Sequence, residues 1–205
     1  MNNITFLLRP TILLLGFLIS INTFSQVTLY SYDFEPSIEG WVIGGTDASR
    51  VNNSTWACGG SYILRSAGND TSQNRLTSPV LDLTGNSSVD ISFCHKADAV
   101  DNNEGFLLEY YDGTSWILLN TYDKGDEFIS RGSTKPHNFT FNLDGATYTL
   151  SASSQFRFSS NNNQAAESNY FDDLLIEGYP AASGPEINIQ GNGNSIVDGD
   201  ASPSL

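Results

Sequence analysis

The chain alternates apolar and polar residues in short runs that end at turn residues. In residues 89–94, Val, Ile and Phe alternate with Asp, Ser and Cys, and residues 137–143 and 155–159 repeat the pattern around phenylalanines. A period of two places successive side chains on opposite faces of a strand. We therefore predict an all-β fold, a jelly-roll β-sandwich of two antiparallel sheets. The predicted strands cover residues 26–34, 40–43, 61–66, 76–83, 89–94, 106–111, 116–122, 137–143, 155–159 and 170–178.

The segments between these strands carry turn chemistry. Asp112-Gly113 separates two aromatic-rich runs, which predicts a β-hairpin. Residues 47–61 are polar and rich in turn residues, which predicts a loop, and residues 86–88 predict a turn. Residues 147–150 predict at most a short β-bridge.

The N-terminus has the pattern of a secretory signal peptide. Arg9 precedes an apolar run at residues 11–21, and residues 22–25 lead to a cleavage site before Gln26. The run is short for a bilayer span, although an uncleaved membrane anchor is the alternative. We predict that residues 1–25 are removed and that the mature chain is secreted or displayed on a bacterial cell surface, with no membrane insertion.

The charge balance excludes several partner classes. The 205-residue chain has 9 Lys and Arg against 23 Asp and Glu, a formal net charge of -14. Such a chain does not neutralise phosphates, so nucleic acid and anionic membrane surfaces are excluded as partners. Aromatic residues make up 12% of the sequence, too many for a disordered chain.

Two cysteines are present, Cys58 and Cys94. In an exported chain an even pair predicts one disulfide, and two buried free thiols are the alternative. The two cysteines and the distant His95 and His137 do not have the spacing of a zinc site.

Carboxylates stand at both ends of the predicted sandwich. Asp33 and Glu35 close the first strand, and Asp172 and Asp173 lie among apolar residues of the last. First and last strands of such a sandwich commonly pair, which would bring these carboxylates together and favour a bound cation. Hard oxygen ligands predict calcium, with Asp47, Asn52 or loop carbonyls completing the shell. The alternative is that one aspartate of each set faces solvent and nothing binds.

No catalytic constellation is visible, so we do not expect an enzyme. Glu104 and Glu109 are spaced to point to opposite faces of a strand. His95 follows a core alternation and is expected to be packed, and Ser61 lacks the Gly-x-Ser-x-Gly elbow.

Aromatic side chains offer a different kind of site. Sugar rings stack on aromatic faces, and a few polar groups then fix their hydroxyls. The alternative is that most of these rings belong to the core. The candidate ligand aromatics are Trp56, Tyr110, Tyr111, Trp116 and Tyr122.

A series of short motifs follows in order along the chain. The motifs are Asp33-Phe34-Glu35, Gly40-Trp41, Ser78-Pro79-Val80-Leu81-Asp82-Leu83, Ile91-Ser92-Phe93-Cys94-His95, Asp112-Gly113 with Trp116, Phe156-Arg157-Phe158 and Phe171-Asp172-Asp173-Leu174. This series resembles MAM domains and the jelly-roll carbohydrate-binding modules of secreted bacterial proteins. The resemblance covers residues 28–178 and implies a β-sandwich with a structural cation, held by Glu35 and by Asp172 or Asp173. Two cysteines are too few for the MAM disulfide scheme.

The composition changes after Tyr179. Residues 180–185 have the composition of a linker. Residues 186–205 resemble the start of the immunoglobulin-like choice-of-anchor repeats of bacterial surface proteins, and a disordered tail is the alternative. We therefore expect a signal peptide (1–25), a sandwich domain (26–179) and the start of a second module (180–205) within a longer multidomain chain.

These observations together favour a non-catalytic extracellular recognition or adhesion module. Its expected partners are glycans or cell-surface proteins, and its expected cofactor is a structural calcium. An accessory domain of a secreted hydrolase and a ligand-free spacer are the alternatives.

Overall fold

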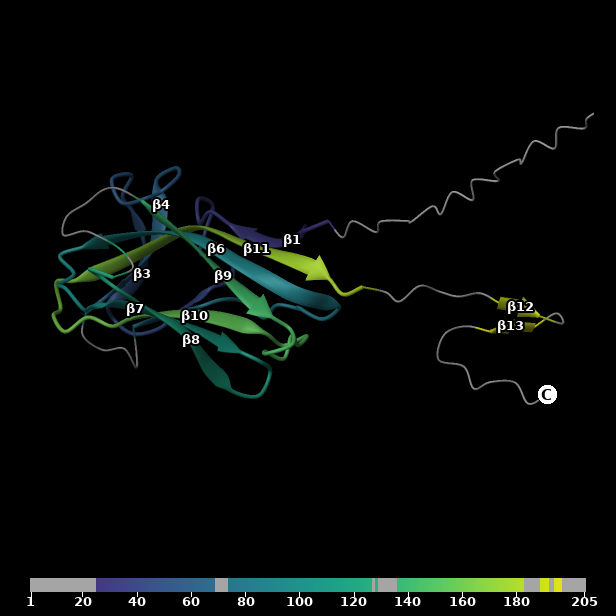
Figure 1. Cartoon of the computed structure of the whole chain (residues 1–205). Coiled ribbons are helices and arrows are strands. Elements are labelled where there is room, and N and C mark those ends of the chain that lie inside the picture. The colour runs from purple at the N-terminus through teal and green to yellow at the C-terminus, as the bar shows by residue number, and fades with distance from the viewer. Residues whose placement is uncertain are drawn as a thin grey trace, which may run out of the picture.

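The chain folds into a β-sandwich of two antiparallel sheets, as predicted (Figure 1). The computed structural model describes residues 25–68, 74–126, 128 and 136–182, and the backbone of residues 189–191 and 194–196. Almost all of the predicted signal peptide lies outside the described residues. Within the described part there is no helix with the length and apolarity needed to cross a membrane.

The first sheet has the strand order β3-β4-β11-β6-β9, and β1 pairs with β11. The expected pairing of the first strand with the last strand of the sandwich is therefore confirmed. Its strands are β1 (Val27–Tyr32), β3 (Ala48–Asn52), β4 (Tyr62–Ala67), β6 (Asn86–Asp98), β9 (His137–Asp144) and β11 (Ser168–Pro180).

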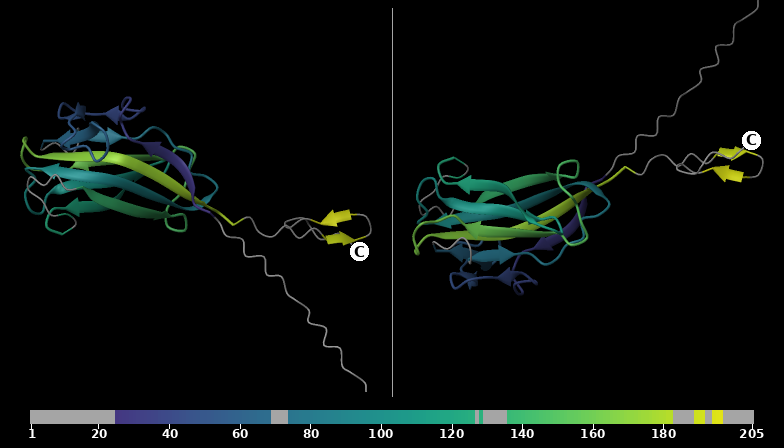
Figure 2. Two further views of the ribbon diagram at one scale, coloured as in Figure 1. Left: turned by 90° about the horizontal axis from the view of Figure 1, so that it is seen from above. Right: turned by 90° about the horizontal axis from the view of Figure 1, so that it is seen from below.

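The second sheet has the order β2-β5-β10-β7-β8 and packs face to face with the first (Figure 2). Strands β7 and β8 form the predicted hairpin, in which the Asp112 carboxylate accepts the N–H groups of Thr114 and Ser115. The strands are β2 (Val42–Ile43), β5 (Arg75–Thr77), β7 (Gly105–Tyr111), β8 (Trp116–Asp123) and β10 (Gln155–Ser160). Beyond the sandwich, β12 (Ile189–Gly191) and β13 (Asn194–Ile196) pair in a separate two-stranded sheet.

Three local predictions were wrong. Strand β3 lies inside the expected loop 47–61, because an edge strand with one solvated face needs few apolar residues. Strand β6 already begins at Asn86, where a turn was expected. The strand expected at 76–83 ends at Thr77, and only a single bridge from Leu81 to Ser154 continues the pairing.

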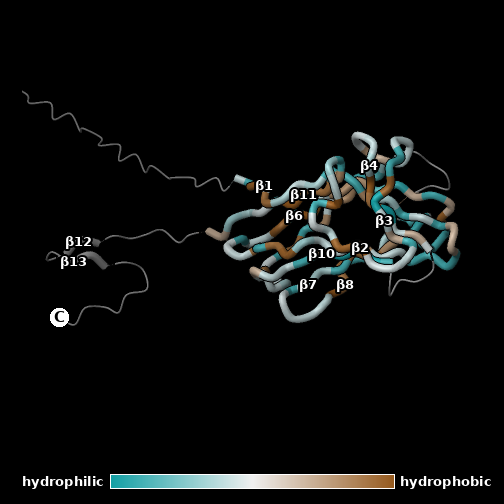
Figure 3. Tube along the Cα trace, turned by 180° about the vertical axis from the view of Figure 1, so that it is seen from behind, coloured by the Kyte–Doolittle hydropathy of each residue, from teal (hydrophilic) through white to brown (hydrophobic). Residues whose placement is uncertain are grey.

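The core between the sheets is rich in aromatic rings. Phe158 stacks on Phe171 with ring centroids 4.4 Å apart, and Phe93 meets Phe158 edge-on at 4.9 Å. Trp41 is buried and stacks on Phe158 with ring centroids 6.1 Å apart. Apolar residues recur along the strands of both sheets, shown in brown in Figure 3. His95 is fully buried among these rings, which confirms the expectation that it is a packing residue.

Candidate functional site

Strand β11 changes its neighbour at the two aspartates. Residues 168–171 pair with β4, and residues 174–178 pair with β1 on the same edge. Asp172 and Asp173 lie between these two ladders, and the pairing with β6 is irregular here as well. Asp173 has a positive φ of 48°, a conformation that aspartate tolerates better than most residues. The acidic pair therefore marks a gap in the sheet edge.

Asp172 is fully buried, and protein groups satisfy its charge. Its Oδ2 atom accepts the backbone N–H groups of Cys58 at 2.8 Å and Gly59 at 3.3 Å. Burial raises the pKa of Asp172 to about 6, against the lowering effect of these N–H donors. Burial lowers the pKa of Lys96, and the negative charge of Asp172 acts in the opposite direction by favouring the protonated amine. Asp172 is therefore an anchor for the loop that contains Cys58.

That loop covers the outer face of the first sheet. The predicted disulfide is present and joins Cys58 to Cys94 of β6, with Cα atoms 6.3 Å apart. Lys96 donates to the carbonyl of Ala57 at 2.6 Å. Trp56 stacks on Tyr170 with ring centroids 5.1 Å apart. A disulfide, a buried lysine and an aromatic stack therefore fix the loop to β6 and β11.

The remaining three predicted ligands converge beside the same loop. The Glu35 Oε1 atom accepts the N–H groups of Ser61 and Tyr62, both at 2.7 Å. Burial raises the pKa of Asp173, and the charges of Asp33 and Glu35 raise it further. Asp33 and Glu35 are therefore near enough to Asp173 for their charges to act on it, whereas Asp172 points to the N–H donors.

The fit of this cluster to calcium is partial. Its oxygens are of the hard type that calcium prefers, and their repulsion is the kind that a cation relieves. However, no three His, Cys, Asp or Glu side chains within the described ranges stand as a group able to hold a metal. Arg50 also occupies two nearby carbonyls, those of Phe34 at 2.7 Å and Glu35 at 2.6 Å. A calcium ion would therefore need these groups to rearrange around it.

Asp47, considered above for the calcium shell, lies elsewhere. Its carbonyl accepts the N–H of Ala67, and its carboxylate stands beside Gly68. Those residues are at the opposite end of β4 from Tyr62, so Asp47 is not part of the acidic cluster.

The outer face of the second sheet carries a different set of groups. Arg157 of β10 makes a two-pronged ion pair with Glu109 of β7, with N–O distances of 2.6 and 2.7 Å. The Arg157 guanidinium carbon also lies 3.9 Å from the ring centroid of Trp116. Because Arg157 is buried and Trp116 is only partly buried, the guanidinium lies on the protein side of the indole. Trp116 is therefore held as a pre-oriented aromatic surface.

Neighbouring residues extend this surface, which we call the tryptophan face and define by Glu109, Tyr111, Trp116, Leu118 and Arg157. The rings of Tyr111 and Trp116 lie 5.4 Å apart at an angle of 40°. Leu118, opposite Glu109 in the ladder, is 55% exposed. The face thus combines two accessible rings, an exposed apolar side chain and a satisfied ion pair.

The other aromatic candidates do not share this face. Tyr122 is only 4% exposed and stacks on Phe106, so its prediction as an exposed ring is wrong. Tyr110 is also buried, and its hydroxyl donates to the carbonyl of Thr149. Trp56 lies on the opposite sheet against Tyr170. Tyr110 and Tyr122 therefore belong to the core, and Trp56 belongs to the loop that contains Cys58.

Sequence reasoning missed Lys96, Arg50 and the pair of Glu109 with Arg157. Lys96 was detectable, because it continues the outward alternation of Ser92 and Cys94 along β6. The cross-strand pair was not, because it depends on the register between β7 and β10.

Comparison with known proteins shows which solved structures share this fold. No family model matches the chain, and no curated protein matches it. The CBM22-1 xylan-binding domain of Paenibacillus barcinonensis Xyn10C is 19% identical with a TM-score of 0.54, covering 78% of this chain and 99% of that domain. The CBM22-1–CBM22-2 tandem domain of the same Xyn10C is 17% identical with a TM-score of 0.56, and the match covers 82% of this chain and 50% of the tandem. The CBM22-1–GH10 structure of Clostridium thermocellum Xyn10B, complexed with xylohexaose, is 14% identical with a TM-score of 0.55. The match covers 76% of this chain and 29% of that one. The chain therefore shares the β-sandwich fold of carbohydrate-binding modules.

Proposed function

We propose that this chain is a non-catalytic glycan-binding module of a secreted or surface-displayed protein, and that the tryptophan face is its ligand surface. The observation that carries the proposal is the arrangement of Trp116 beside Tyr111, with Arg157 and Glu109 fixing the indole from the protein side. A pre-oriented ring loses little conformational entropy when a sugar stacks on it.

The solved structures support this choice of ligand class. One sandwich of the same fold is described as xylan-binding, and another was solved with xylohexaose. The second is also attached to a GH10 module, so an accessory role beside a secreted hydrolase is compatible with the proposal. In either setting the sandwich itself binds and does not catalyse. Glu109 is occupied by Arg157, and His95 is fully buried, so neither is placed to act on a substrate.

The test is to titrate the full chain with soluble oligosaccharides, including xylohexaose, and to measure binding by isothermal titration calorimetry. We expect Trp116→Ala to weaken binding about 30-fold or more, because truncating a central tryptophan typically removes about 2 kcal/mol or more. Trp56→Ala is the matched control, since it removes the same side chain from the opposite sheet and should leave affinity unchanged.

The outcome that contradicts the proposal is specific. If Trp116→Ala binds glycans as well as the native chain while Trp56→Ala does not, the ligand surface is on the first sheet. If no glycan binds but a cell-surface protein does, the module is an adhesin for proteins.

We also propose that Asp33, Glu35 and Asp173 hold a structural calcium that closes the gap in β11. The proposal is supported by the convergence of the three carboxylates and by the raised pKa of Asp173. Calcium should raise the melting temperature of chelator-treated protein, because a ligand of the folded state stabilises it by mass action. Glu35→Gln with Asp173→Asn should remove the part of that increase that comes from this site. A melting temperature that does not respond to calcium in the native chain would refute this part.

A further inference from the structure

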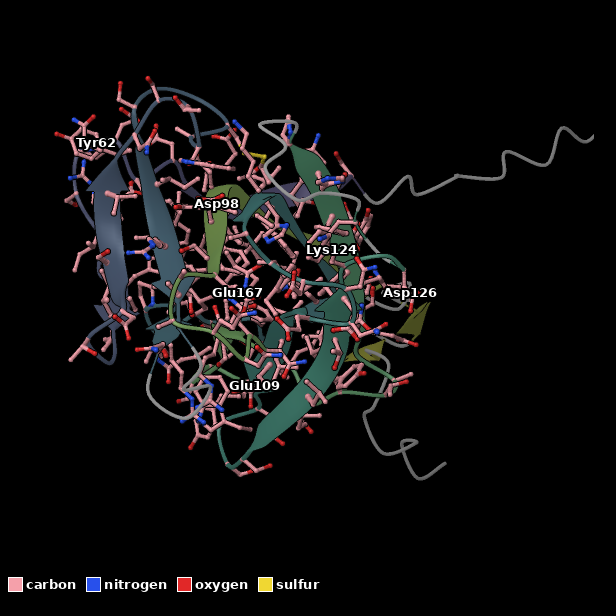
Figure 4. The ribbon with its side chains drawn as sticks, turned by 90° about the vertical axis from the view of Figure 1, so that its left-hand side faces the viewer. Tyr62, Asp98, Glu109, Lys124, Asp126 and Glu167 are labelled. Atoms are coloured by element: carbon pink, nitrogen blue, oxygen red, sulfur yellow. A yellow bond between two sulfur atoms is a disulfide. The ribbon has the colours of Figure 1, made fainter. Side chains whose placement is uncertain are left out.

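A second pair of carboxylates lies at the end of the sandwich where Glu167 is labelled in Figure 4. Glu104 precedes β7 and is 8% exposed, and Glu167 precedes β11 and is 1% exposed. The two loops that carry them, β6–β7 and β10–β11, are far apart in sequence. Asp172 is about 17 Å further along β11, at ~3.3 Å per residue, so this pair is separate from the acidic cluster described above.

One side of each carboxylate is fixed by the protein. Glu104 Oε1 accepts the side-chain amide of Asn163. Glu167 Oε2 accepts the backbone N–H groups of Asn163 at 3.2 Å and Gln164 at 2.9 Å. These bonds hold both groups in place from the β10–β11 loop.

The second oxygen of each carboxylate meets no donor from the part of the chain that the structure describes. Glu104 Oε2 and Glu167 Oε1 are buried atoms without a hydrogen-bond partner among those residues. The two side chains are within hydrogen-bonding reach of each other, and the pKa of Glu104 is raised by burial, then by Glu167 and by the charge of Asp101. Lys124, the nearby amine, donates to the carbonyl of Val100 at 2.6 Å. Two buried carboxylates that face each other are costly unless a cation or a proton lies between them.

We propose that Glu104 and Glu167 bind a divalent cation of the calcium class, which bridges the β6–β7 and β10–β11 loops. The orphaned oxygens supply two hard ligands from a pre-fixed geometry. Because the described residues hold no group of three such side chains, the remaining ligands are backbone carbonyls and water. Asp101, which accepts the Gln164 side-chain amide at 3.1 Å, adds negative charge beside the site.

A shared proton is the competing occupant of the same gap. One protonated carboxyl would donate to the other and satisfy both orphaned atoms without a metal. Glu104→Gln separates the two cases, because its amide can donate to Glu167 as the protonated acid would, and the fold is kept. The same change removes one charged ligand of a metal.

The experiment titrates chelator-treated full chain with calcium at pH 7 by isothermal calorimetry and follows the melting temperature. We expect Glu104→Gln and Glu167→Gln each to lower affinity for one calcium at least tenfold, with circular dichroism unchanged. The Glu35→Gln, Asp173→Asn double variant should keep this site, which separates it from the proposed structural calcium. Glu177→Gln, a charge-matched change on β11 outside both clusters, should bind as the native chain does.

Two outcomes overturn the inference. In one, Glu104→Gln keeps the calcium stoichiometry and affinity of the native chain. In the other, Glu104→Gln melts higher than the native chain whether calcium is present or absent, which identifies a shared proton as the occupant.

Discussion

Removing the Cys58–Cys94 disulfide tests how the covering loop is held. The bond closes a loop with a sequence separation of 36. The chain-entropy relation for that length gives about 4 kcal/mol of stabilisation from restricting the unfolded state. Loss of the bond also weakens the N–H contacts of Cys58 and Gly59 to buried Asp172, so this value is a lower estimate. For a domain of about 150 residues, 4 kcal/mol corresponds to a fall in melting temperature of roughly 8–16 °C.

The assay compares the native chain with the Cys58→Ala, Cys94→Ala double variant by calorimetry at pH 7. Alanine avoids burying a new hydroxyl at position 94, where the side chain is 3% exposed. The native chain measured in reductant should melt with the variant, which controls for the substitutions themselves. A variant that melts within about 2 °C of the oxidised native chain would refute the loop-closure reasoning.

Two further changes address the core and the acidic gap. Burial lowers the pKa of His95 to about 3, so the unfolded chain binds a proton that the folded chain does not. The contribution of His95 to the free energy of unfolding should therefore fall by about 1.4 kcal/mol per pH unit below pH 6.5. His95→Gln should remove this component, and equal slopes in urea unfolding between pH 7 and 5 would count against it. Gly60→Ala should cost about 2–5 kcal/mol, because φ is +60° and a Cβ there meets the Glu35 carboxylate. Gly85→Ala, at φ +76° with nothing nearby, should cost only about 1–2 kcal/mol, and equal losses in melting experiments would exclude the steric contribution.

The sandwich was predictable because its strands carry a period-two pattern that local sequence displays. Residues 137–143 illustrate this, since Phe139, Phe141 and Leu143 all lie on the core side of β9. Strand β3 was not predictable, because Ala48 alone is buried on it and its pairing with β4 supplies the order. Edge strands of this kind are fixed by tertiary context and only weakly by composition.

The acidic residues were found from their unusual sequence position, and the calcium assigned to them stays a prediction. Their unusual position among apolar residues does reflect convergence of β1 and β11. Local sequence does not show which donor binds which carboxylate oxygen. Asp172 accepts the backbone N–H of Cys58, which is far away in the chain. The same limit hid Glu104 and Glu167, which look like ordinary loop carboxylates until the β6–β7 and β10–β11 loops are placed together.

The contacts that stabilise the first sheet lie apart from the proposed ligand surface on the second sheet. On the first sheet, the covering loop beside the gap in β11 is held by the disulfide, by Lys96 and by the carboxylates of Asp172 and Glu35. That loop occupies part of the outer face where a ligand would otherwise lie. On the second sheet, Leu118 is 55% exposed and Trp116 is partly exposed within the described residues, and Arg157 of the ion pair lies beneath the indole. A ligand can therefore bind the second sheet without disturbing the contacts that hold the first sheet together, and glycan affinity should change little when the disulfide is removed from folded protein.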